Sequence, residues 1–153
     1  MEKIEKSIDV NVPVHTAYNQ WTQFEEFPRF MEGVKEVKQL DAKRLHWKAE
    51  ILGKEIEWDA HITEQTPDRQ ISWESTSGAV NRGTVMFKSS EPNKTRITLD
   101  IEYEPRGATE KLGDIVGALS SKVEGDLERF KDFIEQRGSE TGSWRGEIKN
   151  RKV

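Results

Sequence analysis

The chain has 153 residues, a length typical of one domain with a substantial core, and it contains no cysteine, which excludes disulfides and thiolate metal sites. The formal net charge is −4 and lysines and arginines are spread along the chain, so we expect no nucleic-acid partner. Only 33% of the residues are hydrophobic and 34% are charged, but the apolar residues recur at regular spacings, which argues against a disordered protein.

The first ten residues alternate between apolar and charged, unlike a signal peptide. No apolar run approaches the roughly 18 residues that a membrane-spanning helix needs. We therefore expect no integral membrane segment and a cytoplasmic location. Nothing in the sequence indicates an oligomeric state.

The alternation of apolar residues over residues 4–12 predicts a half-buried strand. Pro13 ends this strand and suits the first turn of a helix. Apolar residues at helical spacing then predict two short helices before Gly33. Two further strands are expected over residues 34–40 and 44–52.

Gly53 and Lys54 form a Gly-X pair, which is typical of a two-residue type II′ turn and predicts a hairpin. Counting outward from that turn predicts the cross-strand pairs Leu45–Ile62, Trp47–Ala60, Ala49–Trp58 and His46–His61. In this register one face is wholly apolar and the other wholly polar, and a slip by one residue would mix them. Two histidines without a third ligand are a weak metal signal, so we predict no metal site.

Three more strands are expected around residues 71–75, 85–87 and 97–103, with Gly78 and Gly83 bracketing a loop. Residues 109–137 then predict one long helix. Its apolar stripe consists of Leu112, Ile115, Val116, Leu119, Val123, Leu127, Phe130 and Ile134. The opposite side of the helix carries Asp114, Lys122, Arg129 and Asp132. A helix of this length must lie against a large apolar surface, because propensity alone does not stabilise it.

The order of elements predicts an α+β domain over residues 1–137, in which a curved antiparallel sheet of about seven strands wraps around the long helix. From residue 138 the periodicity is lost and glycine and serine become frequent. We expect residues 138–153 to form a flexible C-terminal tail whose one apolar anchor is Trp144.

The order of these elements, together with particular residues, resembles the START and birch-pollen-allergen (helix-grip, SRPBCC) superfamily, in particular its polyketide cyclase/dehydrase and coenzyme Q-binding-protein branch. The residues that carry the resemblance are Val12, Pro13, Ala17, Tyr18, Trp21, the segment from Phe27 to Met31, Val34, Val37, Trp73, Glu74, Ser75, Gly78, Gly83, Val85, Phe87, Thr95, Ile97, Leu99, Tyr103 and Pro105. The resemblance implies the helix-grip fold with a deep pocket between the sheet and the long helix.

The resemblance and the apolar face of the predicted sheet together suggest the lining of this pocket. We expect it to consist of Trp47, Trp58, Ala60, Ile62, Trp73, Phe87, Leu99, Ile101, Val116, Leu119, Ser120 and Val123. The alternative is that these side chains simply fill the core.

Aromatase/cyclase members of the branch place polar side chains in the pocket, but the corresponding places here are Ala60 and Ile62. We therefore predict no catalytic residue and no cofactor. The expected function is binding of a hydrophobic partner such as a lipid, quinone or polyketide-like molecule, as carrier, sensor or chaperone. A cyclase/dehydrase enzyme needs a polar group inside the pocket and is the first alternative. A protein-interaction module with a collapsed pocket is the second.

Overall fold

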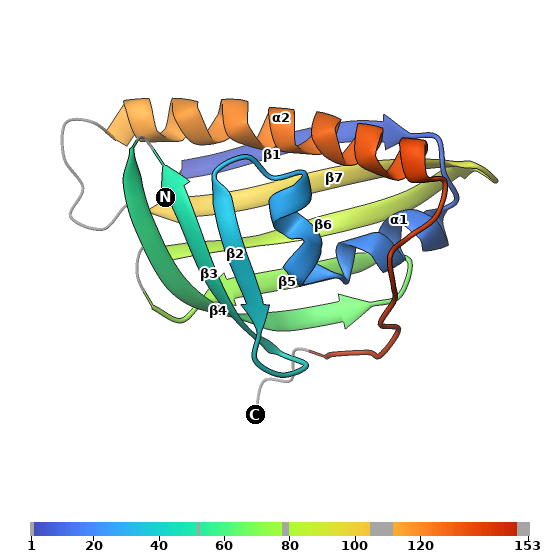
Figure 1. The fold of residues 1–153 in the computed structure, drawn as a ribbon, viewed down its shortest axis with the longest axis horizontal. Helices are drawn as coiled ribbons and strands as arrows, with labels where there is room; N and C mark the ends of the chain where they lie inside the picture. Colours follow the sequence, from blue (N-terminus) through green and yellow to red (C-terminus); the bar gives the residue numbers. More distant parts are fainter. Residues whose placement is uncertain (1, 52, 78–79, 105–111, 150–153) are drawn as a thin grey trace.

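The computed structural model describes residues 2–51, 53–77, 80–104 and 112–149, with the backbone alone for 112–119. The elements in chain order are β1 (Glu2–Val10), α1 (Val14–Trp21), the 3₁₀ helix η1 (Phe24–Arg29), β2 (Val34–Gln39), β3 (Arg44–Ile51), β4 (Lys54–Thr66), β5 (Gln70–Ser75), β6 (Val80–Glu91), β7 (Lys94–Glu104) and α2 (Leu112–Arg137). Within this part of the chain, seven strands form one antiparallel sheet in the order β1-β7-β6-β5-β4-β3-β2. The sheet curves around α2, and α1 and η1 lie at one end of the interior (Figure 1). The predicted α+β helix-grip architecture is confirmed.

Helix α2 packs its apolar stripe against the concave face of the sheet. Val123, Leu127, Phe130 and Ile134 are buried, as the helical spacing predicts. The helix ends at Arg137, where Gly138 has φ 71° and donates its N–H to the Ile134 carbonyl at 2.9 Å. Residues 109–111, where the sequence places the start of the helix, lie outside the described residues.

Aromatic side chains from α1 and η1 fill the interior beside the C-terminal half of α2. The Trp21 and Phe130 ring centroids are 4.9 Å apart, and those of Phe30 and Phe130 are 5.1 Å apart, both in edge-to-face contact. Phe27 lies on the other side of Trp21 at 5.7 Å. These rings close one end of the space between the sheet and the helix.

The predicted register of the β3–β4 hairpin is wrong by two residues. Ile51 pairs with Lys54, and counting outward Trp47 pairs with Trp58 and Leu45 with Ala60. Gly53 is the second of the two residues between the strands and has φ 79°. The turn therefore uses its glycine at the second position, whereas the predicted type II′ turn needs it at the first. A shift by two residues keeps each side chain on its predicted face.

Strand β6 begins at Val80, where the sequence suggested a loop from Gly78 to Gly83; Gly78 itself lies outside the described residues. Gly83 pairs with Trp73 of β5. A Cβ atom at Gly83 would lie 2.6 Å from Trp73 Cζ2 and 2.5 Å from the Asp100 carbonyl oxygen. The glycine therefore leaves the space in which the Trp73 indole lies across β6.

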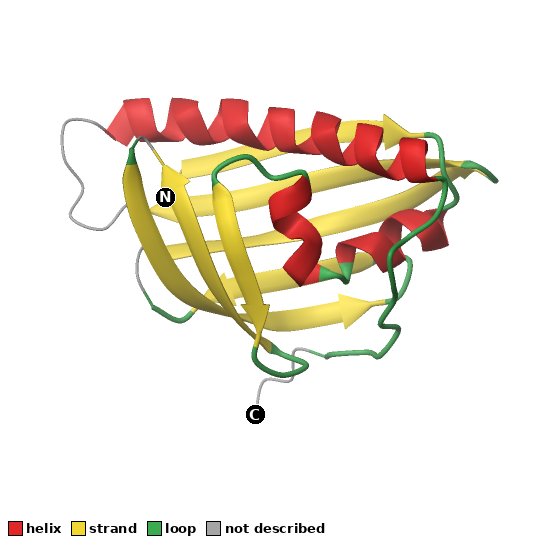
Figure 2. Cartoon of the chain, viewed as in Figure 1, coloured by secondary structure: helices red, strands yellow, loops and turns green. Residues whose placement is uncertain are grey.

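The segment after α2 runs past α1 to the far end of β4 and forms a loop without helix or strand (Figures 1 and 2). Gln20, which is fully buried, accepts the Thr141 N–H at 2.8 Å and donates to the Thr141 hydroxyl at 3.0 Å. Ile148 is buried and exchanges two backbone hydrogen bonds with Gln65, of 2.8 and 2.9 Å. These contacts were not anticipated, and flexibility of residues 138–153 stays a prediction.

None of the helices in the described ranges has the length and the apolar character needed to cross a bilayer.

Candidate functional site: a cavity between the sheet and helix α2

A cavity of about 190 Å³ lies between the concave face of the sheet and α2. Its floor is formed by Trp21, Phe24 and Phe27 of the α1–η1 region. Its walls come from side chains of all seven strands, and α2 covers it from the other side. The lining is predominantly apolar and aromatic with a few polar groups, which is the usual composition of a small-molecule site.

Most of the predicted pocket residues whose side chains are described line this cavity. They are Trp47, Trp58, Ile62, Trp73, Leu99, Ile101 and Val123. Ala60 and Phe87 are buried but are not part of the lining, and Phe87 instead packs edge-on against Tyr18 with a centroid separation of 5.4 Å. Ser120 is partly exposed and also outside the lining. The side chains of Val116 and Leu119 are outside the described part.

Trp47 and Trp58 form one aromatic wall of the cavity. As direct cross-strand partners they stack with their ring centroids 5.6 Å apart and their planes within 6° of parallel. Neither indole is fully buried, although both point to the interior and line the cavity. The corrected register therefore places two large rings side by side, where the predicted register would have alternated tryptophan with alanine.

A charged pair from α2 also lines the cavity, which corrects the prediction that Lys122 lies on the side of the helix away from the sheet. Lys122 Nζ lies 2.7 Å from Asp126 Oδ2. The Asp126 side chain is 8% exposed, and its Oδ1 accepts hydrogen bonds from Arg129 Nη2 at 2.6 Å and from the Glu32 N–H at 3.1 Å. The sequence carried a signal that we missed, since Asp126 lies three residues after Val123 and four before Phe130, within the buried face of the helix.

Two other polar residues, Tyr103 and Asn81, line the cavity. Burial raises the pKa of the Tyr103 phenol, so its hydroxyl stays protonated at neutral pH. A protonated phenol can donate a hydrogen bond to an acceptor in the cavity. Together with Lys122 these residues supply the polar groups that the sequence analysis did not find.

The histidine pair predicted across the β3–β4 hairpin does not form. His46 faces Asp59, and His61 faces Arg44. His46 Nδ1 lies 2.6 Å from Asp59 Oδ1 and Nε2 lies 3.0 Å from Glu57 Oε1. Hydrogen bonds to these two carboxylates raise the pKa of His46. Among the described residues no group of three or more histidine, aspartate or glutamate side chains is arranged to hold a metal ion.

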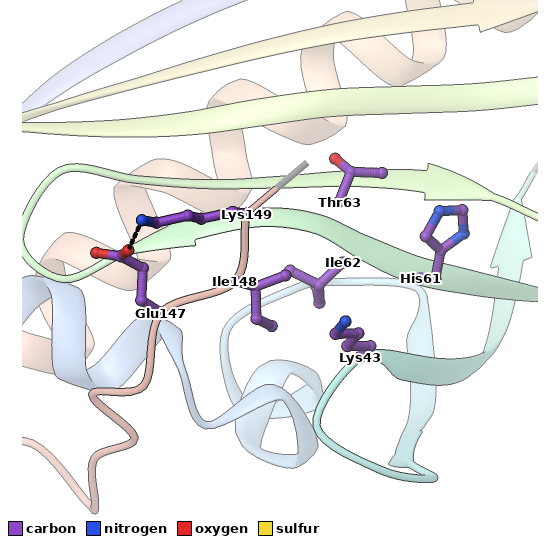
Figure 3. A pocket seen from close by; sticks show the side chains of 7 residues that line it. All are labelled: Lys43, His61, Ile62, Thr63, Glu147, Ile148 and Lys149. Carbon is purple, nitrogen blue, oxygen red and sulfur yellow. Dashed lines mark ion pairs between the residues drawn. The ribbon is translucent and has the colours of Figure 1, made fainter. Parts of the chain in front are cut away.

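A second hollow lies on the surface, where the C-terminal segment passes along β4 (Figure 3). It is an open groove with polar and charged residues on both sides, including Lys43, His61 and the ion pair of Glu147 with Lys149 at 3.3 Å. Ile62 lines both this groove and the cavity. The cavity between the sheet and α2, with its mainly apolar walls, is the better candidate site for a small molecule.

The fold of the chain is shared with solved structures. The Zhui aromatase/cyclase from Streptomyces sp. R1128 superposes with a TM-score of 0.81 at 12% identity, covering 94% of this chain and 99% of that one. A START superfamily protein from Mycobacterium smegmatis superposes with a TM-score of 0.74 at 14% identity, covering 88% and 98%. At these identities the likeness shows a common fold and no more.

Sequence comparison shows the family. An uncharacterised 17.2 kDa protein from the melC2-rnhH intergenic region of Streptomyces lincolnensis is 48% identical over 149 residues, 97% of this chain and 99% of that protein. Residues 10–132, which include strands β2 to β7, the last residue of β1 and most of α2, match the family described as polyketide cyclase/dehydrase and lipid transport. The chain therefore belongs to the polyketide cyclase/dehydrase and lipid transport family.

Proposed function

We propose that the protein binds a hydrophobic small molecule in the cavity between the sheet and α2, as a carrier, sensor or chaperone for it. The observation that carries the proposal is a cavity between the sheet and α2 lined by Trp47, Trp58 and Trp73. The apolar side chains around this space lack packing partners on the cavity side, and an apolar occupant would supply them.

The experiment is a titration of the purified protein with Nile red, a neutral fluorescent probe of apolar sites, after native mass spectrometry for any co-purified molecule. In Ile101→Trp, a larger side chain projects from β7 into the cavity. The matched control is Met86→Trp, because Met86 is 38% exposed on β6 and is not part of the lining.

We expect saturable Nile red binding by the wild type and by Met86→Trp, and its loss in Ile101→Trp. A thermal melt of Ile101→Trp checks that the variant is folded. Forcing a larger side chain into a filled core costs about 1–3 kcal/mol of stability, whereas a cavity accommodates the indole ring at a smaller cost. Equal Nile red binding by Ile101→Trp and Met86→Trp would mean that the probe binds outside the cavity. No probe binding and no co-purified molecule in the wild type would overturn the proposal.

Cyclase/dehydrase chemistry remains the second candidate, and the observation that favours it is the Lys122 ammonium group in the cavity. A fixed cation can stabilise the oxygen of an enolate as it forms. The test follows exchange of the α-protons of a 1,3-diketone in D₂O by NMR. Exchange accelerated by the wild type but not by Lys122→Met would support an enzyme, and equal rates with and without protein would reject it.

A further inference from the structure

Lys122 is held in a defined position at the side of the cavity. Its ammonium group donates to Asp126, and its stem passes over Gly33, where an added Cβ atom would lie 3.5 Å from Lys122 Cε. The same Cβ atom would lie 2.8 Å from the Glu50 carbonyl oxygen, and Gly33 has φ 87°. Glycine at this position lets α2, the start of β2 and the end of β3 approach closely enough to fix the lysine side chain.

Asp126 does not neutralise both of its cationic neighbours. Its one carboxylate is shared by Lys122 and by Arg129, and it also accepts a backbone N–H from Glu32. The nearby acid is Glu32, which lies 3.3 Å from Arg129 Nη1 but has a side chain that is 79% exposed and therefore screened by water. Arg129 is thus shared between Asp126 and Glu32 outside the lining, and Lys122 is the cation of this cluster that lines the cavity.

The ammonium group retains hydrogen-bonding capacity toward the cavity. An ammonium group has three N–H donors, and Asp126 is its hydrogen-bond partner within the described part of the chain. The Lys122 side chain is 21% exposed and contributes to the cavity lining. A carboxylate or phenolate in the cavity can accept charge-assisted hydrogen bonds from the remaining donors.

The size and the walls of the cavity restrict the apolar part of such a molecule. A cavity of about 150 Å³ binds benzene, and pockets for drug-sized ligands measure about 300–1,000 Å³. At about 190 Å³, this cavity matches one or two fused rings. The indoles of Trp47 and Trp58, stacked on each other with their planes within 6° of parallel, offer aromatic surface against which a planar ring system can pack.

We propose that the ligand is a small planar aromatic acid whose anionic group binds Lys122 while its rings lie against the Trp47–Trp58 wall. This inference rests on the proposed ligand-binding function and adds the chemical class of the ligand. Asp126 acts as a positioning residue for Lys122, and the cavity selects against neutral molecules of the same shape.

The test measures displacement of Nile red by 2-naphthoate and by 2-ethylnaphthalene, a neutral molecule of similar shape. The protein variants are Lys122→Met and, as the matched control, Lys131→Met. Lys131 forms the same type of pair on α2, with Glu135, and is not part of the lining. Lys122→Met leaves Asp126 bonded to Arg129 and to the Glu32 N–H, so the carboxylate keeps partners in the variant.

We expect the wild type to prefer naphthoate, and Lys122→Met to lose about tenfold to a hundredfold of that affinity while binding 2-ethylnaphthalene unchanged. Lys131→Met should behave as the wild type. The assignment of Lys122 would be overturned if Lys122→Met lost affinity equally for 2-naphthoate and 2-ethylnaphthalene, or lost affinity for neither. A wild type that binds both compounds equally well would overturn it too. If Nile red binds but neither compound displaces it, the ligand class is wrong and the proposed function stands. If Nile red itself does not bind, the proposed function fails too.

Discussion

Removal of the C-terminal segment should measurably destabilise the domain, because this segment covers buried groups of α1 and β4. The perturbation is truncation after Gly138, compared with the point variant Ile148→Ala. Ile148 is 5% exposed and packs against the core, and Trp144 packs on the same cluster from a partly buried position. Truncation uncovers the hydrogen-bonding groups of Gln20 and the Gln65 backbone to water.

The magnitude follows from the apolar contacts. The hydrogen bonds of the segment contribute about 1 kcal/mol each and do not exceed the cost of ordering its residues, about 1–2 kcal/mol each, so any net stabilisation comes from the apolar contacts. Burying an isoleucine side chain stabilises by about 1.5–3 kcal/mol, and the partly buried Trp144 adds to this. We expect truncation to cost about 2–4 kcal/mol. Ile148→Ala should cost about 2 kcal/mol, at the low end for a core isoleucine, because the segment can detach instead of enclosing a void.

Urea unfolding followed by circular dichroism measures both changes. Leu40→Ala is the control, because Leu40 is 53% exposed and such surface changes stay within about 0.5 kcal/mol. The combined variant Trp144→Ala with Ile148→Ala should cost no more than truncation, since a detached segment has nothing further to lose. The reasoning would be refuted if truncation lowered the free energy of unfolding by less than about 0.5 kcal/mol, or if the point variant lowered it by more than truncation does.

Three further predictions concern the cavity wall and the outer face of the sheet. Asp126→Ala removes the acceptor shared by Lys122, Arg129 and the Glu32 N–H. The free energy of unfolding, measured in urea, should fall by about 2–3 kcal/mol. Breaking a fully buried ion pair costs about 3–5 kcal/mol, and the cost here is smaller because the Arg129 side chain is 38% exposed and screened by water. A change near zero would contradict the burial argument. Gly83→Ala should displace the Trp73 indole and change the near-ultraviolet circular dichroism, with lower stability, because the Asp100 carbonyl blocks the new methyl group. An unchanged spectrum would mean that the neighbouring strands move apart to accommodate the methyl group and the Trp73 indole keeps its place. His46 has a raised pKa, so its pairing with Asp59 and Glu57 stabilises the fold fully below the ordinary value of 6.5, and this contribution is lost as the pH rises through the folded-state pKa. The stability difference between the wild type and His46→Gln should therefore shrink from about pH 5.5 to about pH 8.5, and a constant difference would exclude the linkage.

Sequence reasoning identified the buried face of β4 and of the described part of the α2 stripe, but it did not find the polar part of the site. The alternation along β4 and the stripe on α2 place Trp58 and Val123 toward the interior in the sequence and in the structure alike. Lys122 and Asp126 lie on the flank of the stripe, where spacing alone does not say whether a side chain meets solvent or another element. The loop of residues 30–33 packs on that flank, and only the folded chain shows it.

The sequence by itself determined the order of elements, the fold class and the inward-facing residues, because strand and helix periodicities are local properties of the chain. It did not determine the hairpin register, since a shift of two residues preserves both faces and the pairing of Trp47 with Trp58 depends on the turn. The place of the C-terminal segment and the position of Lys122 were likewise decided by tertiary structure. Their partners, Gln20 and Gln65 in one case and Gly33 in the other, lie about 80 residues or more away along the chain, and contacts over such separations arise only when the sheet curves around α2.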